Sequence, residues 1–260
     1  MLFHIKKLIQ ARDLLWAWTD RIIRSRYQQS ILGGLWAVVQ PVAIVTIFSI
    51  IFTLFIPVDT GGLPYVVFAY VALVPWTLFA SSITDMTNSL VENMSLVNKI
   101  YFPREILPIA AMLTRLLDFA IAYGVLLVLM LYFQLPLFPV GLLFLPLILT
   151  IQLTLALGLG LASTALNVFY RDVKHLLALG LQLWFYASPI VYPVSAVPER
   201  LRPFYFLNPM AGALEAYRAV LLYEELPGSY LFTSALVAIV VFLIGYWLFK
   251  RLEFQFADIV

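Results

Sequence analysis

Two charged residues in an otherwise apolar part of the chain are the first candidates for chemistry. Arg115 and Asp118 lie three positions apart, so on a helix they would stand one turn apart and could neutralise each other. Ionisable groups within apolar spans often mark a proton or ion pathway. A structural ion pair near the end of a span is the simpler interpretation, and it is the one we expect.

The residues that catalytic sites require are largely missing from the sequence. None of the five lysines follows a glycine, so there is no G-x-x-x-x-G-K-[ST] loop to hold the phosphates of ATP. The two histidines, His4 and His175, are far apart, and no G-x-S-x-G is present. The absence of cysteine excludes disulfides, thiol chemistry and most zinc sites. We therefore expect no catalytic residue, no metal site and no cofactor bound by this chain.

Long runs without Asp, Glu, Lys or Arg determine which elements position these residues. Such runs make up 157 of the 260 residues, and the longest covers 119–170. The hydrophobic content is 63% and the mean hydropathy is +0.97. A spanning helix needs about 20 mostly apolar residues, so the longest run contains two spans, which separate near Pro136 and Pro139. A β-barrel would alternate apolar and polar residues, whereas these blocks are apolar on every face. We predict an all-α integral membrane protein with six transmembrane helices, at about 34–57, 63–84, 109–133, 141–169, 176–194 and 229–249.

The distribution of basic residues predicts the orientation. With the N-terminus inside, thirteen of the sixteen Lys and Arg lie on the inner side, and the outer side keeps Arg200, Arg202 and Arg218. By the positive-inside rule both termini face the cytoplasm. Six basic groups precede the first long apolar run, which argues against a cleaved signal peptide. The formal net charge of +2 gives no support for nucleic-acid binding. The expected organisation is a cytoplasmic N-terminal segment (1–33), one six-span domain (34–250) and a cytoplasmic tail (251–260).

The segment before the first span has the pattern of an amphipathic helix. Residues 10–30 place Leu14, Trp18 and Ile22 near one face and Arg12 largely off it. This pattern is typical of a helix that lies in the membrane surface. The alternative is a solvated leader that only supplies positive charge to the inner side.

The predicted second inner loop combines charged and aromatic residues. Within 95–107, charged groups flank an apolar stretch at 100–102, and Pro103 interrupts any helix that would run through the loop. We expect a short helix across the membrane surface. Exposed aromatic side chains beside charges favour a protein contact, since aromatics and Arg are enriched in contact cores. An ordinary connector is the alternative.

The predicted outer connection at 194–228 is long and punctuated by four prolines, yet its apolar content stays high. We expect two short helices that dip into the outer leaflet or lie on it. Backbone at that depth must be buried against protein or line a wet cavity.

Five stretches of the sequence form an ordered set of motifs: RDLLWAWTDRIIRSRYQQSILGGLWAVVQP (12–41), VNKIYFPREILP (97–108), NVFYRDVKH (167–175), SPIVYP (188–193) and NPMAGALEAYR (208–218). With these motifs the chain resembles the membrane subunit of type-2 ATP-binding-cassette exporters, in the branch that exports O-antigen, capsule or teichoic-acid polysaccharides. The resemblance covers almost the whole chain and keeps the order of the motifs.

This resemblance implies partners and roles for the unusual segments. It implies a homodimer in the bacterial inner membrane with two copies of a separate ATPase, which uses ATP and Mg²⁺. The residues implied to form an ATPase-coupling helix are Asn98, Lys99, Ile100, Tyr101, Phe102, Pro103, Arg104 and Glu105. Those of the N-terminal interface helix are Arg21, Arg24, Arg26 and Tyr27. Those of an outer pair of re-entrant gate helices are Pro198, Pro203, Asn208, Pro209, Glu215 and Arg218.

The resemblance also implies that the permeant is an undecaprenyl-linked sugar polymer. The C–H faces of sugars stack on aromatic rings, and their hydroxyls bond to polar side chains. Aromatic residues in spans are more often lipid contacts or packing. The candidate channel aromatics are Phe48, Phe52, Phe55, Trp184, Phe185, Tyr186 and Tyr192.

Other functions stay open on the sequence alone. A type-2 exporter of this architecture could carry a drug or a membrane lipid, because a path without charges also suits apolar cargo. A secondary carrier driven by an ion gradient is a less favoured alternative, since such carriers usually keep ionisable groups at membrane depth. A membrane enzyme comes last, because no catalytic residue can be named.

Overall fold

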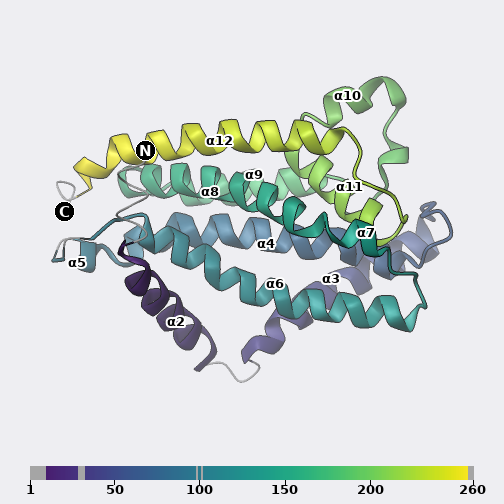
Figure 1. Ribbon diagram of the computed structural model, residues 1–260, viewed down its shortest axis with the longest axis horizontal. Coiled ribbons are helices and arrows are strands. Elements are labelled where there is room, and N and C mark those ends of the chain that lie inside the picture. Colours follow the sequence, from purple (N-terminus) through teal and green to yellow (C-terminus); the bar gives the residue numbers. More distant parts are fainter. Residues whose placement is uncertain (1–9, 29–32, 98, 101, 257–260) are drawn as a thin grey trace.

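A computed structural model of the chain describes residues 10–28, 33–97, 99–100 and 102–256, and this part of the chain is helical without any strand. The long helices lie side by side along one axis (Figure 1). The all-α prediction is therefore confirmed. Within the described residues, five helical stretches are long and apolar enough to cross a membrane: Gly33–Phe55, Tyr65–Glu92, Ile106–Tyr132, Pro139–Phe169 and Tyr230–Gln255.

These stretches match five of the six predicted spans, and some consist of more than one element. The second is helix α4 (Tyr65–Glu92) and the third is α6 (Ile106–Tyr132). The first contains η1 (Gly33–Leu35), α3 (Trp36–Ile50) and the π-helical turn η2 (Ile51–Phe55). The fourth contains α7 (Pro139–Leu142) and α8 (Leu145–Phe169). The last contains α12 (Tyr230–Leu252) and η5 (Glu253–Gln255).

The predicted span at 176–194 is wrong in length. The helix there, α9 (Val173–Tyr186), has 14 residues and so rises only about 21 Å, less than the thickness of a bilayer core. It ends shortly before Pro189, which lacks an N–H and disfavours the helical conformation of Ser188. Helix α9 nevertheless runs beside α8 in the opposite direction, so it returns the chain to the far end of the bundle (Figure 1).

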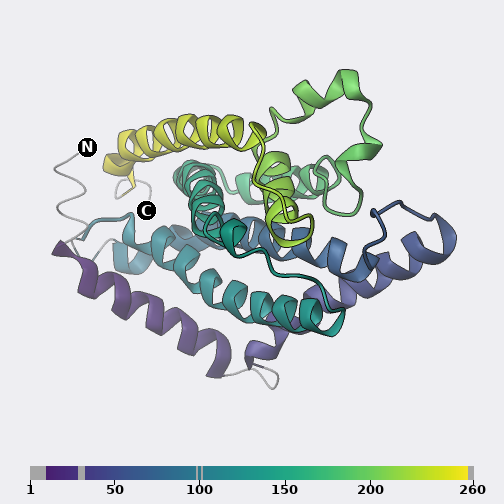
Figure 2. The ribbon, with the colours of Figure 1, turned by 45° about the vertical axis from the view of Figure 1, so that its right-hand side comes forward.

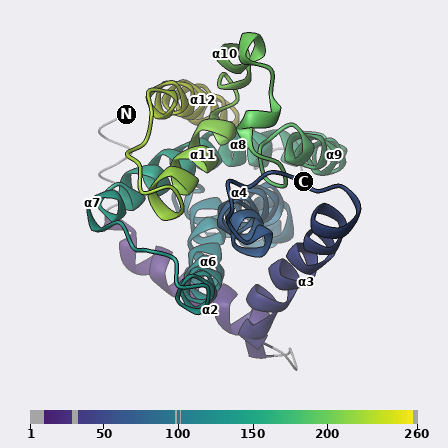
Figure 3. The same ribbon diagram turned by 90° about the vertical axis from the view of Figure 1, so that its right-hand side faces the viewer.

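Helix α4 is the centre of the bundle. It packs against α3, α6, α8, α9 and the short helix α11 (Pro209–Leu221). Looking along the bundle, Figure 3 shows α4 near the middle with α6, α8 and α3 around it. Its apolar residues from Val67 to Val74 are almost completely buried. Helix α4 thus forms the inner wall against which the other helices are positioned.

Small residues allow α8 and α12 to approach closely, and several of them lie in the ALGLGLAS stretch of α8 (156–163). A Cβ added to Gly158 would lie 2.6 Å from the Cα of Phe242, and one added to Gly245 would overlap the Gly158 carbonyl oxygen. A Cβ added to Gly160 would overlap the side chain of Met86 on α4. Glycine at these positions therefore lets the helix backbones pack in direct contact.

The two ends of the bundle carry different elements. At one end lie α2 (Arg12–Gln28), which crosses the bundle obliquely, the one-turn helix α5 (Met94–Val97) and the end of α12 (Figure 1). At the other end lie α7 and α10 (Arg202–Tyr205), and α10 projects away from the bundle (Figure 2). Two short turns precede α10, namely η3 (Val194–Ala196) and η4 (Glu199–Leu201).

Candidate functional site

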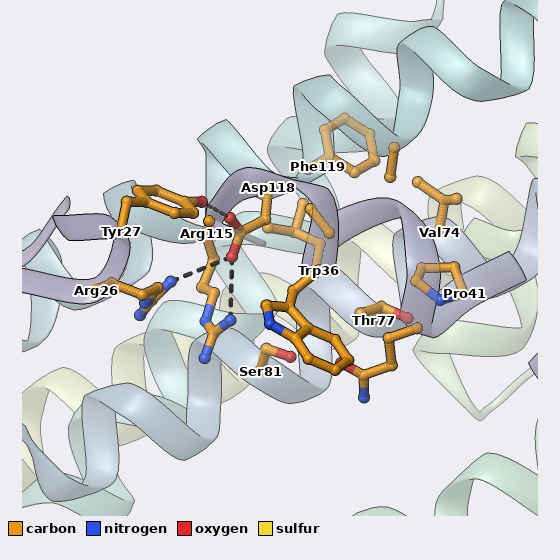
Figure 4. A pocket seen from close by; sticks show the side chains of 15 residues that line it. Arg26, Tyr27, Trp36, Pro41, Val74, Thr77, Ser81, Arg115, Asp118 and Phe119 are labelled. Atoms are coloured by element: carbon orange, nitrogen blue, oxygen red, sulfur yellow. Dashed lines mark hydrogen bonds and ion pairs between the residues drawn. The ribbon is translucent and has the colours of Figure 1, made fainter. Parts of the chain in front are cut away.

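A network of four charged side chains joins three helices at the end of the bundle that carries α2. Arg26 of α2 lies 2.6 Å from Asp85 of α4 and 3.1 Å from Asp118 of α6. Arg115 of α6 lies 2.7 Å from Asp85 and 3.0 Å from Asp118. The predicted Arg115 and Asp118 pair is confirmed, but it is half of a larger network with no net charge. Figure 4 shows the part of this network that surrounds Asp118.

Tyr27 adds a hydrogen bond to the same network. Its hydroxyl donates to Oδ1 of Asp118. Burial, together with this hydrogen bond, raises the pKa of Tyr27 to about 12, so the hydroxyl stays protonated and remains a donor at physiological pH. Two adjacent residues of α2 are therefore bonded to the core of the bundle.

The other two residues assigned to the interface helix do not contact this network. Arg24 pairs with Asp20 at 2.8 Å, and both side chains are more than half exposed. The guanidinium of Arg21 lies 4.5 Å from the ring of Trp18. Trp18 itself is buried against the bundle, which agrees with the predicted apolar face of α2.

A small cavity of about 120 Å³ adjoins the network between α2, α3, α4 and α6. Its wall combines the rings of Trp36 and Phe119 with the polar side chains of Gln40, Thr77 and Ser81 (Figure 4). Stacking surfaces and hydrogen-bonding groups thus face the same space. No charge in this cavity lacks an opposite partner among the described residues, because both arginines and Asp118 belong to the network.

A wider groove lies on the neighbouring side of α4, between α4 and α9. It shares Ser81 and Arg115 with the cavity, so the two spaces adjoin. The groove is lined near the network by Asp85, Thr84 and Gln182, and farther along by Trp76, Phe185 and Tyr186. Its lining therefore changes from polar to aromatic along the bundle.

The aromatic residues predicted to line a channel belong largely to one cluster. Phe48 stacks on Phe52 with ring centres 6.0 Å apart and on Phe185 at 6.2 Å, so the cluster connects α3 to α9. Trp184 contacts Phe79 at 5.3 Å and Trp76 at 6.3 Å. Trp76 and Phe79 of α4 are not among the predicted channel residues, because they lie within an unbroken apolar run that carries no local signal.

Three of the predicted aromatics lie at the margin of this cluster. Tyr186 is 59% exposed and meets Phe185 edge to face at 5.2 Å. Phe55 is 74% exposed. The hydroxyl of Tyr192 bonds to that of Tyr205 at 3.0 Å and donates to the backbone oxygen of Tyr186 at 3.1 Å, so Tyr192 connects the end of α9 to α10.

The predicted coupling residues divide into two groups in the structure. Asn98 and Tyr101 lie outside the described residues. Ile100 is 56% exposed and Lys99 is also exposed, whereas Glu105 is 1% exposed and points inward. The expected helix at 98–105 is not found in the described residues of that stretch; the one helical turn is α5, and Phe102 and Pro103 precede α6 in a non-helical backbone. Pro103 accounts for this, since it disfavours helix in the residue before it.

The predicted outer gate residues build a hydrogen-bonded corner between α9 and α11. Asn208 caps α11, because its Oδ1 accepts from the backbone N–H of Met210 at 3.0 Å and from Trp184 Nε1 at 2.8 Å. Its Nδ2 donates to Ser188 at 3.0 Å. Pro209 occupies the first turn of α11, where a missing N–H costs little. Pro198 precedes η4 and Pro203 lies in α10.

Arg218 is completely buried within this corner. Its guanidinium donates to the backbone oxygens of Ile190 at 2.9 Å and Tyr192 at 3.4 Å, and it lies 3.7 Å from the ring centre of Phe68. Glu215 is 3.8 Å away. Burial lowers the pKa of Arg218 to about 10, which leaves it charged at neutral pH. Arg218 thus satisfies the carbonyl groups that the chain frees when α9 ends.

Comparisons with known proteins point to transport. The family described as ABC-2 type transporter matches residues 13–222. The chain is 31% identical over 262 residues to the O-antigen export system permease protein RfbA of Myxococcus xanthus, covering 99% of each chain. It is 29% identical to a protein of that name from Klebsiella pneumoniae, over 95% of each chain. It is 26% identical to the polysialic acid transport protein KpsM of Escherichia coli, over 90% of this chain and 91% of that one.

Proposed function

Because the chain belongs to the ABC-2 type transporter family as a membrane transport subunit without an ATPase domain, we propose that it exports a lipid-linked polysaccharide from the cytoplasm to the outer face of the bacterial inner membrane. In this proposal two copies of the chain form the channel, and two copies of a separate ATPase use ATP and Mg²⁺. The observation that carries the proposal is the similarity over 99% of the chain to an O-antigen export permease.

The groove beside α4 supports a sugar cargo. Trp76, Phe185 and Tyr186 offer ring faces, and Ser81, Thr84 and Gln182 offer hydrogen bonds. Sugar rings need both kinds of contact, since they carry apolar C–H faces and polar hydroxyls. A purely apolar drug or lipid would leave the polar groups unused. The alternative of an apolar cargo is therefore less well matched to this lining.

The exposed part of the coupling segment supports a docked ATPase. The backbone N–H groups of Lys99 and Ile100 bond to Leu96 of α5. Helix α5 lies at the same end of the bundle as α2 and the end of α12 (Figure 1), which is the cytoplasmic end in the predicted orientation. An exposed apolar side chain beside a basic one is a suitable anchor for a protein partner. We assign the ATPase contact to 99–100 and the neighbouring residues.

Deleting the chain tests the cargo. In a host that assembles a surface polysaccharide with this transporter, loss of the chain should abolish surface polymer and leave polymer inside the cell. Tyr186→Ala should restore export only partly, because it removes an exposed ring from the groove. Phe232→Ala is the matched control, since Phe232 is 75% exposed on α12 and does not line the groove. Normal surface polymer in the deletion strain would contradict the proposed cargo.

Co-purification tests the ATPase partner. Ile100→Asp should reduce the amount of ATPase that purifies with the tagged chain by roughly tenfold or more, because it places a charge where an apolar contact is expected. Leu201→Asp is the control, since Leu201 is 55% exposed at the opposite end of the bundle. Equal recovery of the ATPase with both variants would contradict the assigned contact.

A further inference from the structure

The end of α12 makes an unexpectedly dense set of polar contacts with the coupling segment. Lys250 forms ion pairs with Glu105, which directly precedes α6, and with Glu253 at 2.7 Å. Glu105 is 1% exposed, and Lys250 and Glu253 are less than one fifth exposed. A buried carboxylate without a cation is strongly unfavourable, so Lys250 determines where the start of α6 can lie.

Arg104 is bound to the same part of the chain. Its guanidinium donates to the backbone oxygen of Glu253 and lies 5.7 Å from the ring centre of Phe256. Both charged residues at the base of the coupling segment, Arg104 and Glu105, are thus turned toward the end of α12. Both side chains are therefore occupied by contacts within the chain.

An apolar cluster fixes the end of α12 in place. Phe249 and Phe256 are both completely buried and meet edge to face at 5.7 Å. Phe256 also lies 6.0 Å from Phe169, the last residue of α8. The same cluster contains Ile106 and Leu107 of α6. The apolar contacts therefore join the same two elements as the ion pairs.

We propose that residues 249–256 are a positioning element for ATPase coupling: Lys250, Glu253 and Phe256 hold Arg104 and Glu105, so that a displacement of the exposed residues 99–100 moves α6 and α12 together. This inference rests on the proposed function, because it requires an ATPase at the coupling segment. Helix α12 is continuous from Leu252 back to Tyr230. Its other end contacts the segment between α10 and α11, where the ring of Tyr230 stacks on that of Phe206 with ring centres 4.9 Å apart. Helix α12 thus connects the coupling segment at one end of the bundle to the segment around Phe206 at the other.

The test uses the complete chain in its complex with the ATPase and begins with Lys250→Met. The chain should still reach the membrane and bind the ATPase, and the complex should still hydrolyse ATP. Export should fall roughly tenfold, because a charge-assisted contact to a buried carboxylate is lost. Arg251→Met is the matched control, since Arg251 lies over Trp247 at 5.2 Å and makes no described ion pair with the coupling segment. It should export normally.

A charge exchange separates positioning from simple folding. Lys250→Glu with Glu105→Lys and Glu253→Gln restores opposite charges at positions 250 and 105 without placing two carboxylates side by side. It should recover most of the export that Lys250→Glu alone loses. If Lys250→Met does not accumulate in the membrane, recovery of export by the exchanged variant is the result that supports the proposal, and its failure is the result that overturns it. The proposal is overturned if Lys250→Met exports as well as Arg251→Met, or if the exchanged pair recovers nothing.

A distance measurement tests the positioning element without reference to transport. The sequence has no cysteine, so nitroxide labels can be placed by Ile100→Cys and Phe254→Cys at two exposed sites. The distribution of the label distance should be narrow in the parent and in Arg251→Met, and broad in Lys250→Met. Equal widths would overturn the proposal. A narrow distribution in a chain that binds no ATPase would instead contradict only the proposed function.

Discussion

Single buried charges in this protein stabilise backbone that would otherwise lack partners. Arg218 is the clearest case, because no part of its side chain is exposed and its donors reach the carbonyl groups of Ile190 and Tyr192. In an apolar environment each unsatisfied carbonyl costs on the order of 1–3 kcal/mol. Arg218 therefore stabilises the backbone that follows α9, a helix that stops after 14 residues.

Replacing Arg218 by Met should strongly destabilise the protein. Met keeps much of the volume but removes every donor and leaves Glu215 without its nearby cation, at a cost of about 3–5 kcal/mol. The temperature at which the protein aggregates in detergent, followed by size-exclusion chromatography after heating, should fall on the order of 10 °C. Arg202→Met is the control, since Arg202 lies 3.8 Å from an exposed Glu199. Equal shifts for both variants would contradict the assigned role.

The network around Asp85 has a different consequence, because it attaches a surface helix. Asp85→Asn should leave Arg26 and Arg115 to share Asp118, which weakens the attachment of α2. Amide hydrogen exchange in α2 should become roughly tenfold faster, as expected from losing charge-assisted bonds. Asp20→Asn should change the rate of amide hydrogen exchange in α2 by less than about twofold, since the pair of Asp20 with Arg24 is largely exposed. Unchanged exchange in Asp85→Asn would show that α2 is held by its apolar face alone.

At the scale of elements, the closest contact in the bundle is that between α8 and α12. Gly158 and Gly245 face each other there, and neither position leaves room for a side chain. Close approach of backbones is a common way for membrane helices to associate, because lipid supplies no hydrophobic force between them. The two helices lie in direct contact at this point.

Gly245→Val should force α8 and α12 apart. Overpacking of this kind costs about 1–3 kcal/mol, so the melting temperature in detergent should fall by several degrees. Gly124→Val is the matched control, because a Cβ at Gly124 meets no atom within 4 Å. A variant of Gly245 as stable as the variant of Gly124 would contradict the close contact.

At the scale of the whole molecule, the number of helices that run from one end of the bundle to the other determines at which end α12 finishes. Five long helices alone would place the end of α12 on the side opposite to α2. The structure places both at one end of the bundle, because α9 carries the chain across in spite of its length (Figure 1). A short sixth crossing, completed by the corner around Arg218, is our proposal for the topology.

Labelling of single cysteines in spheroplasts tests this topology, and the natural absence of cysteine provides the background. A maleimide that cannot cross the membrane should react with Asp59→Cys and Glu225→Cys. It should not react with Arg12→Cys or Phe254→Cys until the membrane is permeabilised. Labelling of Phe254→Cys in intact spheroplasts, with Arg12→Cys still protected, would mean that α9 does not cross.

The sequence by itself determined the class of the protein, five of its spans and the amphipathic helix before them. These features depend on transfer of each segment from water to lipid, which is a sum over neighbouring residues. The same holds for the Arg115 and Asp118 pair, since it follows from spacing along one helix.

Only the tertiary structure decided which distant residues meet. Asp85 bonds to Arg26 across 59 positions, and Arg104 and Glu105 turn toward the end of α12. The early end of α9 also depends on Arg218, which lies 28 residues beyond Ile190. A charge near a span can pair with any opposite charge that packing brings within reach, and composition alone does not select the partner. The physical reason is that electrostatic and hydrogen-bond partners are set by helix packing in three dimensions, whereas the preference for lipid is read along the chain.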